Sequence, residues 1–532
     1  MIFESPYPDV TIPDVPVTDH VLADAFKRAD KTALIDVASG ARMSFGELAT
    51  NIRRTAGGLA ARGLAKGDRI AIYSPNTITY PVAFHGAAYA GGVVTTVNPT
   101  YTPEELTSQL RDSKARFLIT LGPFLEKARE AADAAGGIEE IFTFDGAPGS
   151  TPFAELMAAG ELADAKRPKI DPAKDLVALP YSSGTTGISK GVMLTHRNLV
   201  ANMVQLKGTD SLCRAITERD NLMAVLPFFH IYGLGVIMNY ALSRGATLVV
   251  MQRFDLEQFL GAIQEHRVTF AHLVPPILVA LAKHPLVDQY DFSSLEGIMS
   301  GAAPLGGELA QAVEERLGCV VGQGYGLTET SPVTHTAPNQ RKGQTPYDAI
   351  GPSLPNTEIQ IVDPETGQSL GPGERGEVWI RGPQVMVGYF GQPGATAATI
   401  DDEGWLHTGD IGLVDENGLC RIVDRVKELI KYKGYQVAPA ELEAILLTHP
   451  SIKDAAVVRS PDEEAGEVPK AFVVSDGSLT EDDVMSFVAE HVSPQKKVRR
   501  VEFVDSIPKS PSGKILRRVL VEREMMSMEG RS

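Results

Sequence analysis

One loop of this chain combines glycines, hydroxyl side chains and a lysine in the order Tyr181-Ser-Ser-Gly-Thr-Thr-Gly-Ile-Ser-Lys-Gly191. Glycine lets the backbone approach phosphate oxygens closely, hydroxyl groups donate hydrogen bonds to them, and a lysine supplies positive charge. We therefore expect this loop to hold a polyphosphate, with ATP as the expected ligand. The candidate contacts are Ser182, Ser183, Gly184, Thr185, Thr186 and Lys190.

The residues around the lysine differ from those of a P-loop. The P-loop pattern has glycine directly before its lysine and serine or threonine directly after it. Here Ser189 precedes Lys190 and Gly191 follows it, so a P-loop kinase or GTPase is disfavoured. Taken alone, the loop is equally well explained as a turn rich in glycine, serine and threonine between two elements.

Two further segments carry residues suited to a nucleotide. In Gly322-Gln-Gly-Tyr-Gly-Leu-Thr-Glu-Thr330, alternating glycines allow close approach to a flat ligand, Tyr325 offers a ring for adenine, and Glu329 can hold Mg²⁺. In Trp405-Leu-His-Thr-Gly-Asp410, the carboxylate can accept both hydroxyls of a ribose. Each segment by itself is more typical of a structural turn.

Composition and charge narrow the class of protein. The 532 residues include 43% hydrophobic and 22% charged residues, as in a globular enzyme with more than one domain. A formal charge of -17 disfavours nucleic acid as a partner, because phosphate backbones are bound by clustered Lys and Arg. Cys213, Cys319 and Cys420 are widely spaced, which predicts neither disulfides nor a zinc site and fits a reducing compartment.

The N-terminal residues, Met-Ile-Phe-Glu-Ser-Pro-Tyr-Pro, do not show the basic and apolar regions of a signal peptide. The most apolar stretches, 228–242 and 268–282, are interrupted by His230 and by Pro275-Pro276 and are too short to span a membrane. We therefore expect a cytoplasmic protein without an integral membrane segment, in which these stretches form buried core.

Short β-branched apolar runs alternate with amphipathic segments between residues 30 and 350. The runs include 69–73, 92–97, 116–120 and 246–250, and the segment from Thr102 begins with the signals of a helix N-terminus. This alternation predicts the α/β class, with parallel-sheet subdomains.

The pattern of apolar and turn residues changes in the last third of the chain. From about residue 351, turn-punctuated strands such as 358–363 and 376–382 predict a β subdomain, and a small α+β module follows. We expect an N-terminal domain at residues 1–425, made of the α/β subdomains and the β subdomain, and a C-terminal domain at 426–532.

In this order, the segments resemble the adenylate-forming superfamily of acyl-CoA synthetases, adenylation domains and firefly luciferase, over nearly the whole chain. Further matching segments are Leu226-Pro-Phe-Phe-His-Ile-Tyr-Gly, Met299-Ser-Gly-Ala-Ala-Pro-Leu-Gly, Gly376-Glu-Val-Trp-Ile-Arg-Gly, Asp424-Arg-Val-Lys-Glu-Leu-Ile-Lys-Tyr-Lys-Gly-Tyr-Gln436 and Pro508-Lys-Ser-Pro-Ser-Gly-Lys514. The segment 429–441 and the segment from Met299 are most similar to 4-coumarate:CoA ligases and their acyl-CoA synthetase relatives.

The resemblance implies an ATP-dependent carboxylic acid:CoA ligase that uses Mg²⁺. ATP converts the acid to an acyl-AMP with loss of pyrophosphate, and the thiol of CoA then forms the thioester. The implied catalytic residues are Thr186, Glu329, Lys431, Gln436 and Lys514, with Glu329 as the Mg²⁺ ligand. The implied ATP or AMP contacts beyond the glycine-rich loop are Gln323, Gly324, Tyr325, Thr328, Asp410, Arg425, Lys427 and Lys514.

Lys514 is the central candidate, because the matching lysine of relatives bridges the carboxylate and the α-phosphate and stabilises charge in the transition state. From the residues alone, a solvated lysine in a basic tail would be the simpler interpretation, since Arg517 and Arg518 follow.

The same resemblance implies that the C-terminal domain is mobile and swings about residues 425–427 between the two steps. The swing withdraws Lys514 and presents Lys433 and Gly434 beside a channel for the pantetheine of CoA. Arg253 matches a basic residue near the CoA nucleotide, although an ordinary surface arginine explains it almost as well.

Small and apolar side chains dominate the acyl pocket that the resemblance implies. Its residues are His230, Tyr232, Val236, Met299, Ala302, Ala303, Gly324, Pro332 and Val333. Val236 replaces a serine of the plant coumarate enzymes, which favours an apolar tail over a ring hydroxyl. The candidate acids are coumarate, other cinnamate-type aryl acids and medium-chain fatty acids. For His230, a buried structural role is the alternative.

Two other activities begin with the same adenylate, namely loading of a carrier-protein thiol and luciferase-like oxygenation. No carrier domain with its serine attachment site is evident after Lys514, so a stand-alone CoA enzyme is expected. An inactive relative is disfavoured because Lys190, Glu329, Asp410, Arg425 and Lys514 are all present. The oligomeric state is left open between monomer and homodimer.

Overall fold

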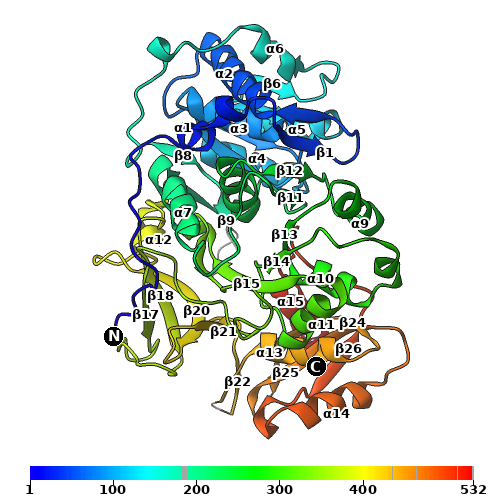
Figure 1. Cartoon of the computed structure of the whole chain (residues 1–532). Coiled ribbons are helices and arrows are strands. Elements are labelled where there is room, and N and C mark those ends of the chain that lie inside the picture. Colours follow the sequence, from blue (N-terminus) through cyan, green and yellow to red (C-terminus); the bar gives the residue numbers. More distant parts are fainter. Residues whose placement is uncertain (183–188, 434, 463, 512, 530–532) are drawn as a thin grey trace.

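The computed structural model describes residues 1–182, 189–433, 435–462, 464–511 and 513–529 (Figure 1). Some site candidates lie outside the described residues, namely Ser183, Gly184, Thr185, Thr186 and Gly434. The cysteines Cys213, Cys319 and Cys420 are buried and unpaired. No helix within the described ranges has both the length and the apolar character needed to cross a membrane.

A mostly parallel sheet carries the central part of the chain. Its strand order is β16-β15-β14-β13-β11-β12-β1-β2, with parallel pairing from β15 to β1 and antiparallel strands at both edges. Its strands are β1 (Thr32–Asp36), β2 (Arg42–Ser44), β11 (Asn221–Ala224), β12 (Thr247–Val250), β13 (Phe270–Leu273), β14 (Gly297–Ser300), β15 (Val320–Gly326) and β16 (Val333–Thr336). The carboxyl ends of β13, β14 and β15 therefore meet at one edge, where parallel sheets bind ligands.

A second sheet has the order β19-β10-β8-β4-β3-β5-β6-β7, with β9 paired to β10. Strands β3 to β8 pair in parallel, whereas β10 is antiparallel to β8, β9 and β19. Its strands are β3 (Arg69–Tyr73), β4 (Val93–Val97), β5 (Ala115–Thr120), β6 (Glu140–Thr143), β7 (Thr151–Pro152), β8 (Leu176–Ala178), β9 (Tyr181–Ser182), β10 (Lys190–Thr195) and β19 (Gly388–Tyr389).

Helices flank these two sheets, and Figure 1 shows α9, α10 and α11 on the side of β13 and β15. The α-helices are α1 (Val17–Leu22), α2 (Phe45–Ala61), α3 (Tyr80–Tyr89), α4 (Pro103–Ser113), α5 (Leu125–Ala135), α6 (Phe153–Ala158), α7 (His196–Gly208), α8 (Ala241–Ser243), α9 (Leu256–Glu265), α10 (Pro275–Lys283), α11 (Gly307–Leu317) and α12 (Pro393–Ala397). The shorter helices are η1 (Ala25–Arg28), η2 (Gly122–Phe124), η3 (Asp164–Lys166), η5 (Pro285–Gln289) and η6 (Thr328–Thr330), and the π-helix is η4 (Tyr232–Tyr240).

Two smaller sheets complete the chain. The antiparallel sheet β17-β18-β20-β21 consists of β17 (Glu358–Val362), β18 (Gly376–Arg381), β20 (Leu406–Val414) and β21 (Cys420–Arg425). The C-terminal sheet β23-β22-β25-β24, with β26 beside β25, consists of β22 (Ile430–Tyr432), β23 (Tyr435–Val437), β24 (Ile452–Asp462), β25 (Gly466–Ser475) and β26 (Arg500–Phe503). Its helices are α13 (Pro439–Thr448), α14 (Glu481–His491), η7 (Pro494–Lys496) and α15 (Arg517–Glu529).

The C-terminal sheet has an apolar core of its own, which includes Ile430, Val457, Val473 and Val488, all fully buried. The α/β class and the separate C-terminal sheet confirm the predicted fold class. Because β21 ends at Arg425 and β22 begins at Ile430, the expected hinge lies between two sheets. The domain division at residue 425 stays a prediction.

The sequence signals for individual elements have clear counterparts. The runs at 69–73, 92–97, 116–120 and 246–250 correspond to β3, β4, β5 and β12, with end shifts of a residue. At the start of α4, the Thr102 hydroxyl accepts the Glu105 N–H at 3.3 Å, and the Glu105 carboxylate accepts the Thr102 N–H at 2.8 Å. This reciprocal cap satisfies backbone donors that a helix leaves unpaired.

Candidate active site

Neighbouring parallel strands bring the first site residues together. His272 of β13 pairs in register with Met299 of β14, which pairs with Gly322 of β15. Beyond that point β15 passes very close to the turn that leads to β16. A Cβ added at Gly326 would lie 1.9 Å from the Pro332 carbonyl oxygen, so only glycine fits there.

Glu329 is a buried carboxylate at the end of this turn, with 8% of its surface exposed. Its Oε1 accepts hydrogen bonds from the Ser182 hydroxyl and the Tyr389 hydroxyl, both at 2.9 Å. The Lys190 ammonium lies 5.0 Å from the centroid of the Tyr389 ring. The structure thus brings the two ends of the glycine-rich loop to Glu329, although these segments are far apart in sequence.

The group around Glu329 fits one Mg²⁺ ion held jointly with a substrate. Among the described residues, no group of three or more His, Cys, Asp or Glu side chains could hold a metal by itself. Within the described part of the chain, the Ser182 and Tyr389 hydroxyls both donate to Oε1 of Glu329. Mg²⁺ in nucleotide enzymes is commonly held by one or two carboxylates together with the phosphates.

A second group joins β15 to the antiparallel sheet. Asp410 of β20 pairs in register with Arg425 of β21, and the Arg425 Nε lies 3.4 Å from its Oδ1. The Tyr325 hydroxyl donates to the other oxygen, Oδ2, at 2.5 Å. Burial raises the pKa of the Asp410 carboxyl, while Arg425 and the Tyr325 hydroxyl act in the opposite direction. Predicted ribose and adenine contacts therefore adjoin each other.

Lys514 reaches this group from the loop between β26 and α15. Its backbone N–H donates to the Ser510 hydroxyl at 3.1 Å, and its carbonyl accepts the Ser510 N–H at 2.8 Å, which fixes the turn. Burial and the Arg425 guanidinium lower the pKa of the Lys514 ammonium, against the opposing effect of the Asp410 and Glu329 carboxylates. Both carboxylates are therefore near enough to Lys514 to favour its charged form.

Three other basic or polar candidates lie elsewhere. Lys431 and Gln436 pair in register on the β22–β23 hairpin, and both are exposed. Lys433 at the hairpin tip forms an ion pair with Glu464. Their side chains thus differ in surroundings from Asp410 and Glu329, which are buried.

The expected acyl-pocket residues surround the π-helix η4. The Tyr232 hydroxyl lies 3.0 Å from His272 Nδ1 and 3.3 Å from the Met299 carbonyl oxygen, to which it can donate. One turn further, Val236 packs in a cluster with Val333 and Leu354, all at most 9% exposed. This part of η4 therefore packs among aliphatic side chains.

His230 stands at the entrance to η4. Its Nδ1 accepts the N–H of Tyr232 at 3.3 Å. Burial, together with the nearby Lys514 ammonium, lowers the pKa of His230 to about 3. The imidazole is therefore neutral near pH 7, which suits a pocket residue better than a proton donor.

The remaining candidates have varied positions. Ala302, with φ +68°, and Ala303 follow β14, and the buried Pro332 follows Ser331. Thr328 is the first residue of η6. Arg253 is exposed between β12 and α9, and Lys427 is exposed between β21 and β22.

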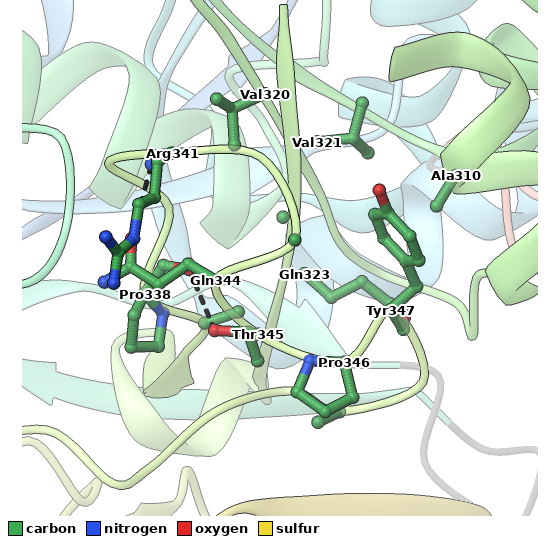
Figure 2. Close-up of a pocket in the computed structure, with 14 residues that line it drawn as sticks. Ala310, Val320, Val321, Gln323, Pro338, Arg341, Gln344, Thr345, Pro346 and Tyr347 are labelled. Atoms are coloured by element: carbon green, nitrogen blue, oxygen red, sulfur yellow. Dashed lines mark hydrogen bonds between the residues drawn. The ribbon is translucent and has the colours of Figure 1, made fainter. Parts of the chain in front are cut away.

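Gln323 holds backbone segments in place. Its Oε1 accepts the Leu305 N–H at 3.1 Å, and its Nε2 donates to the carbonyls of Leu305 and Tyr347. Figure 2 shows its side chain between β15 and the segment around Pro346, beside a cavity of about 10 Å³. Such a volume accommodates at most a water molecule, so this cavity is not the ligand site.

Some residues of the site were not anticipated from the sequence. Tyr389 joins Glu329 to Lys190, His272 holds the Tyr232 hydroxyl, and Leu354 closes the pocket beside Val236. None of them belongs to a segment whose residue types and spacing indicated chemistry. The apolar strand around His272 gave the one available signal, a histidine in an otherwise hydrophobic run.

Comparisons with known proteins cover both parts of this site. A family model described as AMP-binding enzyme matches residues 22–390, and one described as AMP-binding enzyme C-terminal domain matches residues 441–514. A similar protein, 4-coumarate--CoA ligase 1 of Petroselinum crispum, is 45% identical over 532 residues, covering 98% of this chain and 97% of the relative.

Solved structures show the same arrangement of elements. ATP-bound MatB from Rhodopseudomonas palustris matches with a TM-score of 0.84 and 30% identity, covering 96% of this chain and 99% of that one. A benzoate CoA ligase from Burkholderia xenovorans LB400 matches with a TM-score of 0.84 and 28% identity, covering 95% and 99%. The similarity thus includes the segments that carry Glu329 and Lys514.

Proposed function

The chain belongs to the AMP-binding enzyme family, and we propose that it activates an aryl acid of the cinnamate or 4-coumarate type or a medium-chain fatty acid. Its reaction is the ATP-dependent, AMP-forming ligation of a carboxylic acid to CoA, with Mg²⁺ as the cofactor. The observation that most supports our assignment of residues is that the buried carboxylates of Asp410 and Glu329 lie near enough to Lys514 to affect its pKa.

In the first step, a carboxylate oxygen attacks the α-phosphorus of ATP, and the bond to pyrophosphate breaks. Nucleophile and phosphate are both anionic, so the reaction needs positive charge between them. The Lys514 ammonium supplies it at the carboxylate and α-phosphate, and Lys190 supplies it at the other phosphates. Asp410 accepts the ribose hydroxyls, and Tyr325 lies beside the adenine. Gln323, Gly324, Thr328, Arg425 and Lys427 complete the proposed ATP contacts.

Glu329 would hold Mg²⁺ together with phosphate oxygens, and the bound ion neutralises charge on the leaving pyrophosphate. Ser182 and Tyr389 keep the Glu329 carboxylate in position through their hydrogen bonds to Oε1. Ser183, Gly184, Thr185 and Thr186 are proposed as further phosphate contacts on the basis of the sequence.

In the second step, the thiol sulfur of CoA attacks the acyl carbon, and the bond to AMP breaks. We assign Lys431, Lys433, Gly434, Gln436 and Arg253 to this step. The exposed hairpin supports a second arrangement of the C-terminal domain, reached by rotation about residues 425–427. Lys514 and the hairpin then occupy the site in turn. The domain boundary after residue 425 and a cytoplasmic location are parts of the same proposal.

The choice of acid follows from the wall of the pocket. Val236, Val333 and Leu354 offer no hydrogen-bonding side chain at its far end, which favours an unsubstituted ring or an alkyl chain. A ring hydroxyl placed there would lose its hydrogen bonds to water without gaining new ones. Cinnamate-type acids and medium-chain fatty acids are therefore favoured over 4-coumarate itself.

The experiment is pyrophosphate release with ATP and Mg²⁺ across cinnamate, 4-coumarate, benzoate and fatty acids of increasing length, each with and without CoA. We expect sustained turnover only with CoA, and faster turnover with cinnamate than with 4-coumarate. Preference for 4-coumarate would keep the acid class but contradict the inference drawn from Val236. Adenylate formation without a CoA thioester would move the assignment to carrier loading or oxygenation.

A further inference from the structure

Helix α10 of the N-terminal part touches the C-terminal sheet region at both of its ends. At its start, a Cβ built on Gly513 would lie 3.0 Å from Val274 Cγ2 and 3.7 Å from Pro276 Cδ. At its end, Lys283 reaches the turn between α13 and β24. The residue before Lys514 therefore rests on the same helix that carries Lys283.

Lys283 donates to the end of α13. Its Nζ lies 2.9 Å from the Leu447 carbonyl oxygen, 3.1 Å from that of Ile452 and 3.5 Å from that of His449. The last carbonyls of a helix have no partner within the helix, and they carry the negative end of its dipole. In many helices a basic side chain of the last turn bonds to these carbonyls. Here the ammonium group of Lys283, from a distant part of the chain, does so.

The apolar contact beside this cap is small. Where α11 faces α13, a Cβ on Gly306 would lie 3.3 Å from the Ala444 Cβ, so the helices meet through side chains of minimal size. A cavity of about 350 Å³ lies between them, and Lys283, Gly307 and Leu447 are among its lining residues. Figure 1 shows α10 and α11 next to α13. Where small side chains meet beside a cavity, little apolar surface is buried, and polar contacts contribute more to holding the two helices together.

We propose that Lys283 is a positioning residue for acyl-AMP formation, because it caps α13 and so holds the C-terminal domain where Lys514 enters the active site. This inference rests on the proposed function. In this proposal Lys283 does not contact the substrate. Its hydrogen bonds favour one of two arrangements of the same chain. A releasable contact of this kind suits a domain that has to leave again before CoA reacts.

The test compares two half-reactions in Lys283→Met, which removes the charge and retains the stem. Adenylation is followed as pyrophosphate release in a single turnover without CoA, and thioesterification as acyl-CoA formation from a supplied acyl-AMP and CoA. Losing the Lys283 contacts destabilises the arrangement that carries out adenylation. If the other arrangement already dominates, adenylation slows; if not, thioesterification becomes faster. We expect the ratio of the two rates to fall about 3- to 20-fold.

Two variants serve as controls. Lys283→Arg keeps a cation in reach of the carbonyls and is expected to restore most of the ratio. Lys174→Met removes a lysine whose side chain is 83% exposed on the N-terminal part, and is expected to leave the ratio unchanged.

An unchanged ratio in Lys283→Met, or an equal loss in both half-reactions, would overturn the inference, because a merely structural role affects both steps alike. The proposed function fails separately, if the unaltered protein releases no pyrophosphate with any acid. Thermal melting of each variant shows that the comparison is made between folded proteins.

Discussion

Lys514 is a cation that the fold places beside another cation, Arg425. Burial also separates it from water, so its charged form is held at a disadvantage until an anion arrives. The substrate carboxylate and the α-phosphate supply the negative charge. The ammonium interacts more strongly with them in the transition state than in the ground state. The strain on the charged lysine before binding is therefore part of how it acts.

Replacing Lys514 by alanine should separate the two half-reactions. We expect adenylation to slow by roughly 100- to 1000-fold, the usual effect of losing one electrostatic contact in a transition state. Thioesterification of a supplied acyl-AMP should continue, because Lys514 has left the site by then. Single-turnover rates of both steps check this, and a folded variant that loses both contradicts the assignment.

The lowered pKa of Lys514 also predicts how adenylation depends on pH. The protonated lysine is the active form, and its pKa in the free protein lies below the ordinary value for lysine. The rate constant kcat/KM for adenylation should therefore decline with rising pH before an ordinary lysine would lose its proton. Bound ATP raises the pKa, so the decline of kcat should lie at higher pH. In Lys514→Arg the residual activity should lack this alkaline limb.

At the residue level, the sequence was informative where side-chain type alone indicates chemistry. Asp410, Glu329 and Lys514 were predicted as site residues, and the two carboxylates are near enough to Lys514 to affect its pKa. Tyr389 and His272 were not, since each acts through one hydrogen bond to a residue remote in the chain. Such pairing depends on packing, and no local pattern encodes it.

The π-helix η4 carries two residues of the acyl pocket that we propose, Tyr232 and Val236. Its wider turn places Tyr232 at the carboxyl end of β13 and Val236 against Val333. A π-helix is rare and often marks a functional site. Close packing accompanies it, since a Cβ at Gly235 would lie 2.8 Å from Pro332 Cδ.

Val236→Ser should change the choice of acid. The hydroxyl would offer a partner to a ring hydroxyl and would be poorly solvated beside an unsubstituted ring. We expect the ratio of kcat/KM for 4-coumarate to that for cinnamate to rise about tenfold. Val236→Ala, which removes volume without adding a polar group, is the control, and an equal rise in that variant would contradict the explanation.

At the scale of elements, the sequence predicted the positions of strands better than the type of the helix η4 or the order of the strands in each sheet. The runs that became β3, β5 and β12 were recognisable from β-branched residues. For the stretch around η4 the sequence predicted buried core and acyl-pocket residues but not a π-helix, because the difference between α and π turns is decided by packing against Pro332 and Val333. The order of the strands in each sheet likewise depends on long-range pairing.

At the scale of the whole molecule, Lys514 lies near Asp410 and Glu329 in this structure, whereas Lys431 and Gln436 of the β22–β23 hairpin are exposed. The sequence predicted both sets of residues but could not show which one the folded chain presents. In our proposal the two sets enter one site in turn, and the contacts that favour one of them, such as those of Lys283 with the carbonyls of Leu447, His449 and Ile452, join segments distant in the chain.

The central claim is that this arrangement forms the acyl-AMP and that a different one forms the thioester. The most direct measurement is made on the double variant Gly306→Cys/Ala444→Cys, whose Cβ atoms would lie 3.3 Å apart, close to the separation found in disulfides. Cys213, Cys319 and Cys420 are buried, which keeps them from competing. The two single variants are the controls.

In the oxidised double variant we expect adenylation to persist and thioesterification of a supplied acyl-AMP to fall by about 100-fold or more, with full recovery when dithiothreitol reduces the bond. Thioester formation at the unaltered rate by the fully cross-linked protein would contradict the account.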